Sequence, residues 1–304
     1  MIKINPVSYQ NIYFKSAKPP INYPAAQIEQ DSIKDENIIG QGANSIVYSI
    51  PYSSDFCLKV LNKPDPNKIK SDEFPQGVNL GQPVWQDEDN PNILMLRRIK
   101  GEENSIPNWS KTIFDPQTGA PQSVTKEQAG IYLSKVRAIA NMPQKSYNEL
   151  AYKIKILEDR GYKLDSINPN NLIVNFDDNE INVIDYFKIP PYDIDKGVYK
   201  NCYLDIVSLA LDFTLLPEYF DKLSKEEQDE LADCIAKINS KAYLAAVSQG
   251  LSCNSEKFRN FIYYTIQWFE VQDNNEYIRK YEQRTEDFIK MLKNPWEWAQ
   301  KRRG

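Results

Sequence analysis

The sequence contains no histidine, and this absence removes several classes of enzyme. Ser-His-Asp and Cys-His nucleophilic sites and the HExxH zinc site all need an imidazole. The cysteines Cys57, Cys202, Cys234 and Cys253 show no CxxC spacing, so a zinc site is not expected either. Any general base must therefore be a carboxylate, a lysine, a tyrosine or a cysteine.

Long hydrophobic runs and an excess of positive charge are also missing. No apolar run approaches the ~18 residues of a membrane span, and the N-terminus lacks the apolar core of a signal peptide. The net charge of −5 disfavours a general nucleic-acid binder. The basic end, Lys301-Arg302-Arg303, is too short to change this and is expected to be a solvated tail. Isolated cysteines fit a reducing compartment, either the cytoplasm or, after secretion, the cytosol of a host cell.

A chain of 304 residues, 41% of them hydrophobic, can form one large domain or a two-lobed one. Residues 1–32 combine several prolines with polar and aromatic residues, and they predict an extended or disordered leader without a core of its own. The alternative for this segment is the translocation leader of a secreted effector protein.

Residues 33–61 predict three strands, with a glycine-containing turn between the first two. The turn reads Gly40-Gln41-Gly42-Ala43-Asn44-Ser45, and an apolar strand follows over residues 46–50. Glycine lets the backbone come close to a ligand, and the N–H groups of such a turn can bind phosphate oxygens. The spacing alone is equally typical of a tight hairpin.

The third strand, residues 56–61, carries Lys59 between apolar neighbours. Strand alternation places this lysine either on an exposed face or toward a buried anion. Glu73 and Glu88 are the alternatives for its ion-pair partner. Residues 93–99 predict a buried strand, and Lys100-Gly101 a hinge that leaves it.

The second half of the chain predicts mostly helix. The expected helices lie near residues 125–140, 147–160, 225–238, 241–249, 256–270 and 275–292. Two of them open with the spacing of a capping box, Ser146 with Glu149 and Ser224 with Glu227.

Two short apolar strands interrupt this helical half. The first follows Asn171, the turn lies at residues 177–179, and the second is closed by Asp185. Because the turn brings the two strands together, the Asn171 amide and the Asp185 carboxylate are expected near one edge. Amide and carboxylate oxygens are hard ligands that suit Mg²⁺.

Five motifs in this order resemble the protein-kinase superfamily, over roughly residues 36–215. They are Gly40-x-Gly42-x-x-Ser45-x-Val47, the strand Phe56-Cys57-Leu58-Lys59, the loop from Arg160 to Leu172, the triplet Asp185-Tyr186-Phe187, and the helix start Asp205-x-x-Ser208-Leu209. The resemblance implies an α+β, two-lobed protein-kinase-like fold. Its small β-rich N-lobe would cover residues 33–101 and its mostly helical C-lobe residues 102–304.

The resemblance also implies ATP and Mg²⁺ as cofactors. Lys59 would hold the α- and β-phosphates, while Asn171 and Asp185 would bind Mg²⁺. The residues expected at the nucleotide are Gly40, Gly42, Ser45 and Val47 of the glycine-rich loop and Met95 at the adenine pocket.

Two departures from the family pattern concern catalysis. Counting back five positions from Asn171 places Ser166 where the family carries its catalytic aspartate. A serine hydroxyl is a poor base near neutral pH, so Asp165, one residue away, is the alternative catalytic residue beside Lys59 and Asp185. The stretch from Asp185 to Asp205 is also short and lacks an Ala-Pro-Glu motif, as in certain bacterial effector kinases.

These observations predict an ATP/Mg-binding, kinase-like protein, and they favour an atypical protein phosphotransferase with an altered catalytic loop. One alternative is a pseudokinase, a nucleotide-binding module that presents a surface to a protein partner. The other is a kinase-fold enzyme that transfers AMP. The substrate and the partner are not specified by the sequence.

Overall fold

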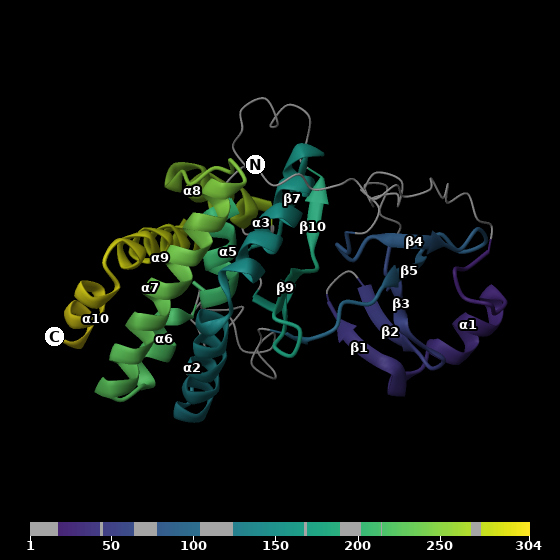
Figure 1. The fold of residues 1–304 in the computed structure, drawn as a ribbon, viewed down its shortest axis with the longest axis horizontal. Coiled ribbons are helices and arrows are strands. Elements are labelled where there is room, and N and C mark those ends of the chain that lie inside the picture. Colours follow the sequence, from purple (N-terminus) through teal and green to yellow (C-terminus); the bar gives the residue numbers. More distant parts are fainter. Residues whose placement is uncertain are drawn as a thin grey trace, which may run out of the picture. The chain divides into compact units, whose positions relative to one another are not determined.

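The computed structural model describes residues 18–42, 45–63, 78–103, 124–166, 169–188, 202–213, 215–268 and 275–304. The chain divides into two compact units, Met1–Arg98 and Ile99–Gly304, here called the N-terminal and C-terminal units. The N-terminal unit is built on an antiparallel sheet, and the described part of the C-terminal unit is mostly helical (Figure 1). The α+β class expected from the sequence is therefore confirmed.

The sheet of the N-terminal unit has the strand order β1-β2-β3-β5-β4, and every neighbouring pair is antiparallel. Its strands are β1 (Ile38–Gln41), β2 (Ser45–Ile50), β3 (Ser53–Leu61), β4 (Pro83–Gln86) and β5 (Ile93–Arg97). The 3-10 turn η1 (Asp35–Asn37) leads into β1. The predicted strands at 46–50, 56–61 and 93–99 correspond to β2, β3 and β5, whereas β4 lies in a stretch for which no strand was predicted.

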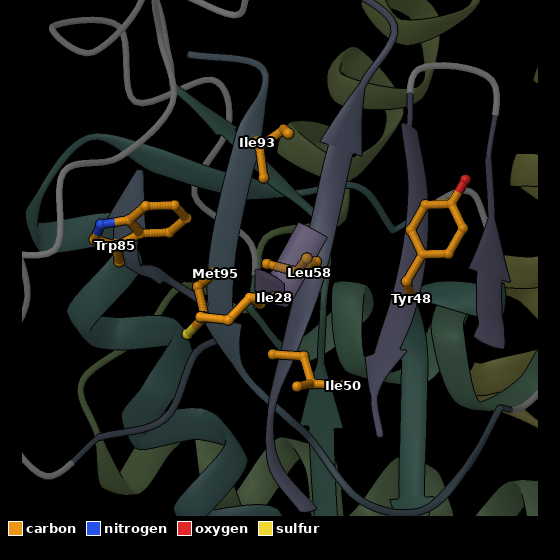
Figure 2. Close-up of a cluster of buried hydrophobic side chains, with 7 residues drawn as sticks. All are labelled: Ile28, Tyr48, Ile50, Leu58, Trp85, Ile93 and Met95. Atoms are coloured by element: carbon orange, nitrogen blue, oxygen red, sulfur yellow. The ribbon is translucent and has the colours of Figure 1, made fainter. Parts of the chain in front are cut away.

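Part of the expected leader is helical and belongs to the core. Helix α1 (Ala25–Ser32) packs against β2. Its Ile28 is fully buried in one hydrophobic cluster with six sheet residues, shown in Figure 2: Tyr48, Ile50, Leu58, Trp85, Ile93 and Met95. The prediction of an extended leader up to residue 32 is therefore wrong for residues 25–32, because burial of Ile28 stabilises a helix there. Residues 1–17 lie outside the described part.

The helices of the C-terminal unit are α2 (Lys126–Asn141), α3 (Gln144–Asp159), α5 (Cys202–Leu211), α6 (Leu216–Lys222), α7 (Lys225–Ser248), α8 (Ser255–Trp268), α9 (Asn275–Lys293) and α10 (Pro295–Arg303). Helix α7 packs against α2, α3 and α5, so it forms the centre of the bundle (Figure 1). Its buried residues recur at helical spacing, including Leu231, Ile235, Ile238, Ala242 and Ala245. The two helices predicted at 225–238 and 241–249 are this one continuous helix.

The two predicted capping boxes have different outcomes. Ser224 accepts a hydrogen bond from the Glu227 backbone, and the Glu227 side chain accepts one from the Ser224 backbone, which confirms the second box. The first box is wrong, because α3 begins earlier with Pro143 as its N-cap and no side-chain cap bond. Ser146 lies inside that helix, and its hydroxyl donates to the Asn179 carbonyl instead.

Two small antiparallel sheets contain or flank Asn171 and Asp185, the residues that were expected to bind Mg²⁺. One has the order β6-β8-β9, and the other pairs β7 with β10. The strands are β6 (Glu102–Glu103), β7 (Tyr162–Leu164), β8 (Leu172–Asn175), β9 (Glu180–Val183) and β10 (Tyr186–Lys188). Gly101 precedes β6 with φ +139°, and a Cβ there would lie 2.6 Å from the Val174 carbonyl oxygen. Only glycine allows this approach of the backbone to β8.

The basic C-terminus is not a solvated tail. It is the last turn of α10, where Arg302 pairs with Asp221 at 2.8 Å and Arg303 pairs with Asp229 at 2.6 Å. These ion pairs connect α10 to α6 and α7. Among the described residues, no helix combines the length and the apolar character needed to cross a membrane.

Candidate functional site

The turn between β1 and β2 is a closed hairpin. The Gly42 N–H donates to the Ser45 carbonyl at 2.9 Å, and Gly40 lies opposite Val47 in the register. The Gly42 N–H is therefore used within the hairpin, which contradicts the expectation that it is free for a phosphate. Residues 43 and 44, at the tip, lie outside the described part.

Three of the residues expected at the nucleotide lie in one row across the sheet. The register pairs Gly40 with Val47, Val47 with Lys59, and Lys59 with Leu94. Directly opposed residues of an antiparallel pair share a face, with Cβ atoms roughly 4.5–5.5 Å apart. Gly40 has no Cβ, so this row offers an open position beside the Val47 side chain and the half-buried Lys59.

Met95 lies on the opposite face of the sheet. Successive strand residues point to opposite faces, and Met95 lies opposite Leu58, the neighbour of Lys59. Met95 is fully buried in the cluster that includes Ile28 (Figure 2). The prediction that Met95 contacts the nucleotide is therefore corrected: Met95 is a core residue on the α1 side, and Leu94 lies on the Lys59 side.

The predicted ion pair of Lys59 is not formed with Glu88. Glu88 is exposed, and within the described ranges Lys59 makes no ion pair. Glu73, the alternative, lies outside those ranges. The Lys59 charge still acts on its own face of the sheet: burial raises the pKa of Cys57 to about 11, and Arg98 and Lys59 oppose that rise.

Three candidate residues of the C-terminal unit are linked to one another by hydrogen bonds. The Asp165 N–H donates to the Asp185 carbonyl at 3.2 Å, and the Asn171 side-chain amide donates to the Asp165 carbonyl at 3.0 Å. The Ile184 N–H donates to the Asn171 carbonyl at 3.0 Å. Pairing of β7 with β10 (Figure 1) and pairing of β8 with β9 hold this arrangement together. The structure thus brings Asp165, Asn171 and Asp185 into one cluster.

The donor atoms of this cluster fit a magnesium ion. Because the Asn171 NH₂ donates to a carbonyl, its Oδ1 is the amide atom left for a cation, and Asn171 itself is buried. Asp185 is exposed and supplies a carboxylate two residues beyond β9. Within the part of the chain that is described, no three Asp, Glu, Cys or His side chains form a metal-binding group. One carboxylate and one amide match Mg²⁺, which keeps several waters and usually also binds substrate phosphates.

Ser166, at the position that family spacing assigns to the catalytic aspartate, points into the protein. It is fully buried, and its hydroxyl donates to the Asp205 carboxylate at 2.9 Å. Asp165, in contrast, is partly exposed. Of these two neighbouring residues, Asp165 has the partly exposed side chain, and the Ser166 hydroxyl has a structural partner.

The neighbouring tyrosine stays neutral. Burial, and then the charge of Asp185, raises the pKa of Tyr186. Its ring lies edge-on to Tyr162 across the β7–β10 pair, with 6.0 Å between the ring centroids. Tyr186 is thus a packing group next to Asp185 and not a general base.

Sequence reasoning missed a buried ion pair behind this cluster. Lys163 on β7 pairs with Asp205 on α5, and each side chain is only 1% exposed. The signal in the sequence was a lysine within the short apolar stretch Tyr162-Lys163-Leu164. The residues between Lys188 and Cys202, which were expected to form a shortened activation segment, lie outside the described ranges.

No protein-family model and no curated protein sequence matches the chain.

Proposed function

We propose that the protein binds ATP and Mg²⁺ and acts as an atypical kinase-like phosphotransferase, with Asp165 as the carboxylate at the transfer site. The observation that carries the proposal is the hydrogen-bonded cluster of Asp165, Asn171 and Asp185. This cluster combines an amide oxygen and a carboxylate, which are donors that suit Mg²⁺, with a second carboxylate that is partly exposed, and the chain has no histidine that would act as a base instead.

Each residue has a defined part in the proposed reaction. Lys59 neutralises negative charge on the nucleotide phosphates, and the Asn171 Oδ1 and the Asp185 carboxylate hold the cation. The chemistry that Mg²⁺ would supply when held by these residues is neutralisation of the charge that builds up on the phosphate oxygens during transfer. The oxygen of the acceptor hydroxyl forms a bond to the γ-phosphorus while Asp165 accepts the proton of that hydroxyl. The bond between the γ-phosphorus and the bridging oxygen breaks, and ADP leaves with the bridging oxygen.

Label transfer from γ-labelled ATP with Mg²⁺ tests this assignment. Asp165→Asn and Asp185→Asn are expected to lower the rate ~10²–10⁴-fold, and Lys59→Ala to weaken nucleotide binding. Asp177→Asn is the matched control, because Asp177 is an exposed carboxylate in the β8–β9 turn of the same motif. Full activity in Asp185→Asn, or an equal loss in Asp177→Asn, would refute the proposal.

A pseudokinase is the second candidate, and the burial of Ser166 favours it. No carboxylate occupies the position that spacing assigns to the base, while Lys59, Asn171 and Asp185 are all present. This candidate predicts a thermal shift with ATP and Mg²⁺ that Asp185→Asn abolishes, together with no label transfer to any protein. Transfer that depends on Asp165 would exclude it.

A further inference from the structure

The C-terminal unit has a groove between helix α2, strand β6 and the turn that connects β8 to β9. Its volume is about 530 Å³, which lies within the range of ligand-binding pockets. Ile131 of α2 and Phe176 of the turn line the groove, and these side chains are 38% and 36% exposed. None of the described residues that line the groove belongs to the cluster of Asp165, Asn171 and Asp185. The proposed reaction therefore gives this groove no role.

Helix α2 has two different sides. Its buried residues include Tyr132, Leu133 and Val136, and the helix packs on α7. The residues that line the groove recur at intervals of three or four positions, from Glu127 to Ala138. Such a spacing places them on one side of the helix. The groove side of α2 is therefore separate from the side that forms the core.

Gly130 lies on the groove side of α2, where the fold does not require a glycine. A glycine inside a helix is less stable than an alanine, because the unfolded chain is more flexible there. A Cβ at Gly130 would meet no atom of the described residues within 4 Å, so no close contact within the protein excludes a side chain. The missing side chain instead leaves room in the groove for the close approach of a ligand.

The exposed charge at the groove is negative. Glu102 on β6 and Glu127 in the first turn of α2 both line it, and both are exposed. Lys135 also lines the groove, but it is partly buried. Complementary charge selects partners and suppresses wrong ones. An apolar groove with exposed carboxylates therefore favours a ligand that is both apolar and cationic.

A second copy of the chain does not offer such a ligand at its basic end. Lys301, Arg302 and Arg303 all form ion pairs within their own chain. The net charge of −5 also makes two copies repel each other on average. A groove along one helix suits a short segment that binds through a few apolar side chains.

We propose that this groove binds a short segment of a partner protein in which Arg or Lys flanks an apolar side chain. The apolar side chain packs on Ile131 and Phe176, in the space that Gly130 leaves open. The basic groups pair with Glu102 and Glu127. This binding does not require ATP, so it stands or falls separately from the proposed function.

Selection from random short peptides displayed on phage, with the full chain as bait, tests the proposal. We expect enrichment of peptides that combine Arg or Lys with Leu, Ile, Met or Phe. The enriched peptides are then synthesised with a fluorescent label, and their binding is measured by anisotropy without nucleotide. Gly130→Leu fills the groove and should weaken this binding at least ~10-fold. The control Ser240→Leu adds the same side chain at an exposed position of α7 and should not change it.

Two further variants separate the charge and the space from folding. Glu127→Lys should also weaken binding at least ~10-fold, whereas Glu226→Lys should not. Glu226 is the matched control because both glutamates lie in the first turn of a helix and interact with its dipole alike. Gly130→Ala should weaken binding while stabilising α2, so that loss of binding cannot be assigned to unfolding.

Equal enrichment on the wild type and on Gly130→Leu overturns the proposal, and so does failure to enrich any peptide. Enrichment of apolar peptides that lack basic residues overturns the role of Glu102 and Glu127. A wild-type dimer in sedimentation that Gly130→Leu abolishes would assign the groove to a second copy and overturn the partner. Label transfer from ATP should be equal in wild type and Gly130→Leu. Its absence in the wild type overturns the proposed function, and the peptide measurements still decide this proposal.

Discussion

Restoring an aspartate at the position that family spacing assigns to the catalytic base should damage this protein. Ser166→Asp places a second carboxylate next to Asp205, because the Ser166 hydroxyl is fully buried and 2.9 Å from an Asp205 oxygen. Lys163 already pairs with Asp205, and one ammonium cannot neutralise two carboxylates. The new side chain is expected to lower stability without creating a base at the transfer site.

The expected loss of stability in Ser166→Asp is the same whether the new carboxyl group is ionised or protonated. If the new carboxylate ionises, repulsion from Asp205 across about 4 Å costs ~4 kcal/mol at an effective dielectric constant near 20. If it stays protonated at pH 7, its pKa must rise by about 3 units above the usual ~3.9, which costs ~4 kcal/mol as well. A loss of ~4 kcal/mol is a large fraction of the 5–15 kcal/mol that typically stabilises a domain.

Urea unfolding at pH 7, followed by fluorescence and circular dichroism, measures this loss. Ser134→Asp is the matched control, because Ser134 lies on an exposed face of α2, and its effect should stay within ~0.5 kcal/mol. A Ser166→Asp protein of wild-type stability that transfers phosphate faster than wild type would refute the reasoning. It would mean that residue 166, and not Asp165, faces the reacting groups.

Three further predictions concern stability in the two units. Ile28→Ala should lower the free energy of unfolding by ~2–5 kcal/mol, because Ile28 is fully buried. The control Ile33→Ala should lower it much less, because the Ile33 side chain is 38% exposed. Equal urea midpoints for the two variants would contradict the packing of α1 on the sheet. Burial, and then nearby carboxylates, raises the pKa of Glu29 above 4.5 in the folded protein. The folded state therefore binds a proton at Glu29 more tightly than the unfolded state does, and the free energy of unfolding falls as the pH rises from the unfolded pKa through the folded pKa. Glu29→Gln should therefore raise the urea midpoint more at pH 7 than at pH 4. Gly101→Ala should lower the melting temperature, because Gly101 has a positive φ and a Cβ there would clash with the Val174 carbonyl. Gly130→Ala should raise the melting temperature, because Gly130 lies inside α2 with open space around it. Shifts of the same sign in the two variants would contradict these predictions.

The strands and long helices were predictable because local periodicity determines them. In β3 and β5 the core residues Leu58 and Met95 alternate with Lys59 and Leu94, so the two faces of the sheet follow from counting by two. Counting does not say which face a ligand uses. The family resemblance assigned Met95 to the nucleotide, although Met95 lies on the face covered by α1.

Helix α1 shows what local reasoning leaves out. It has only eight residues, too few for a stable isolated helix, and it follows a proline-rich stretch. Its stability comes from packing Ile28 into the sheet, a contact that depends on residues tens of positions away. A prediction from propensity alone therefore favoured an extended chain.

Two copies of the same capping pattern show how a tertiary contact overrides a local one. Both Ser146 and Ser224 are followed three positions later by glutamate, yet only Ser224 caps a helix. Pro143 starts α3 before Ser146 is reached, and the Ser146 hydroxyl then bonds to the Asn179 carbonyl in the β8–β9 turn. The pattern is the same in both places, and the long-range partner decides its use.

The same logic decides the identity of the candidate base. Counting back from Asn171 selects Ser166, but counting assumes that the loop presents the same side chain as in the family. Here the buried Asp205 draws both Lys163 and Ser166 inward, and the residue between them that remains partly exposed is Asp165. A serine at the counted position therefore does not by itself show that the base is lost. Whether the protein keeps a base depends instead on whether the carboxylate of Asp165 lies at the transfer site. The backbone of Asp165 is held by its hydrogen bonds to Asp185 and Asn171.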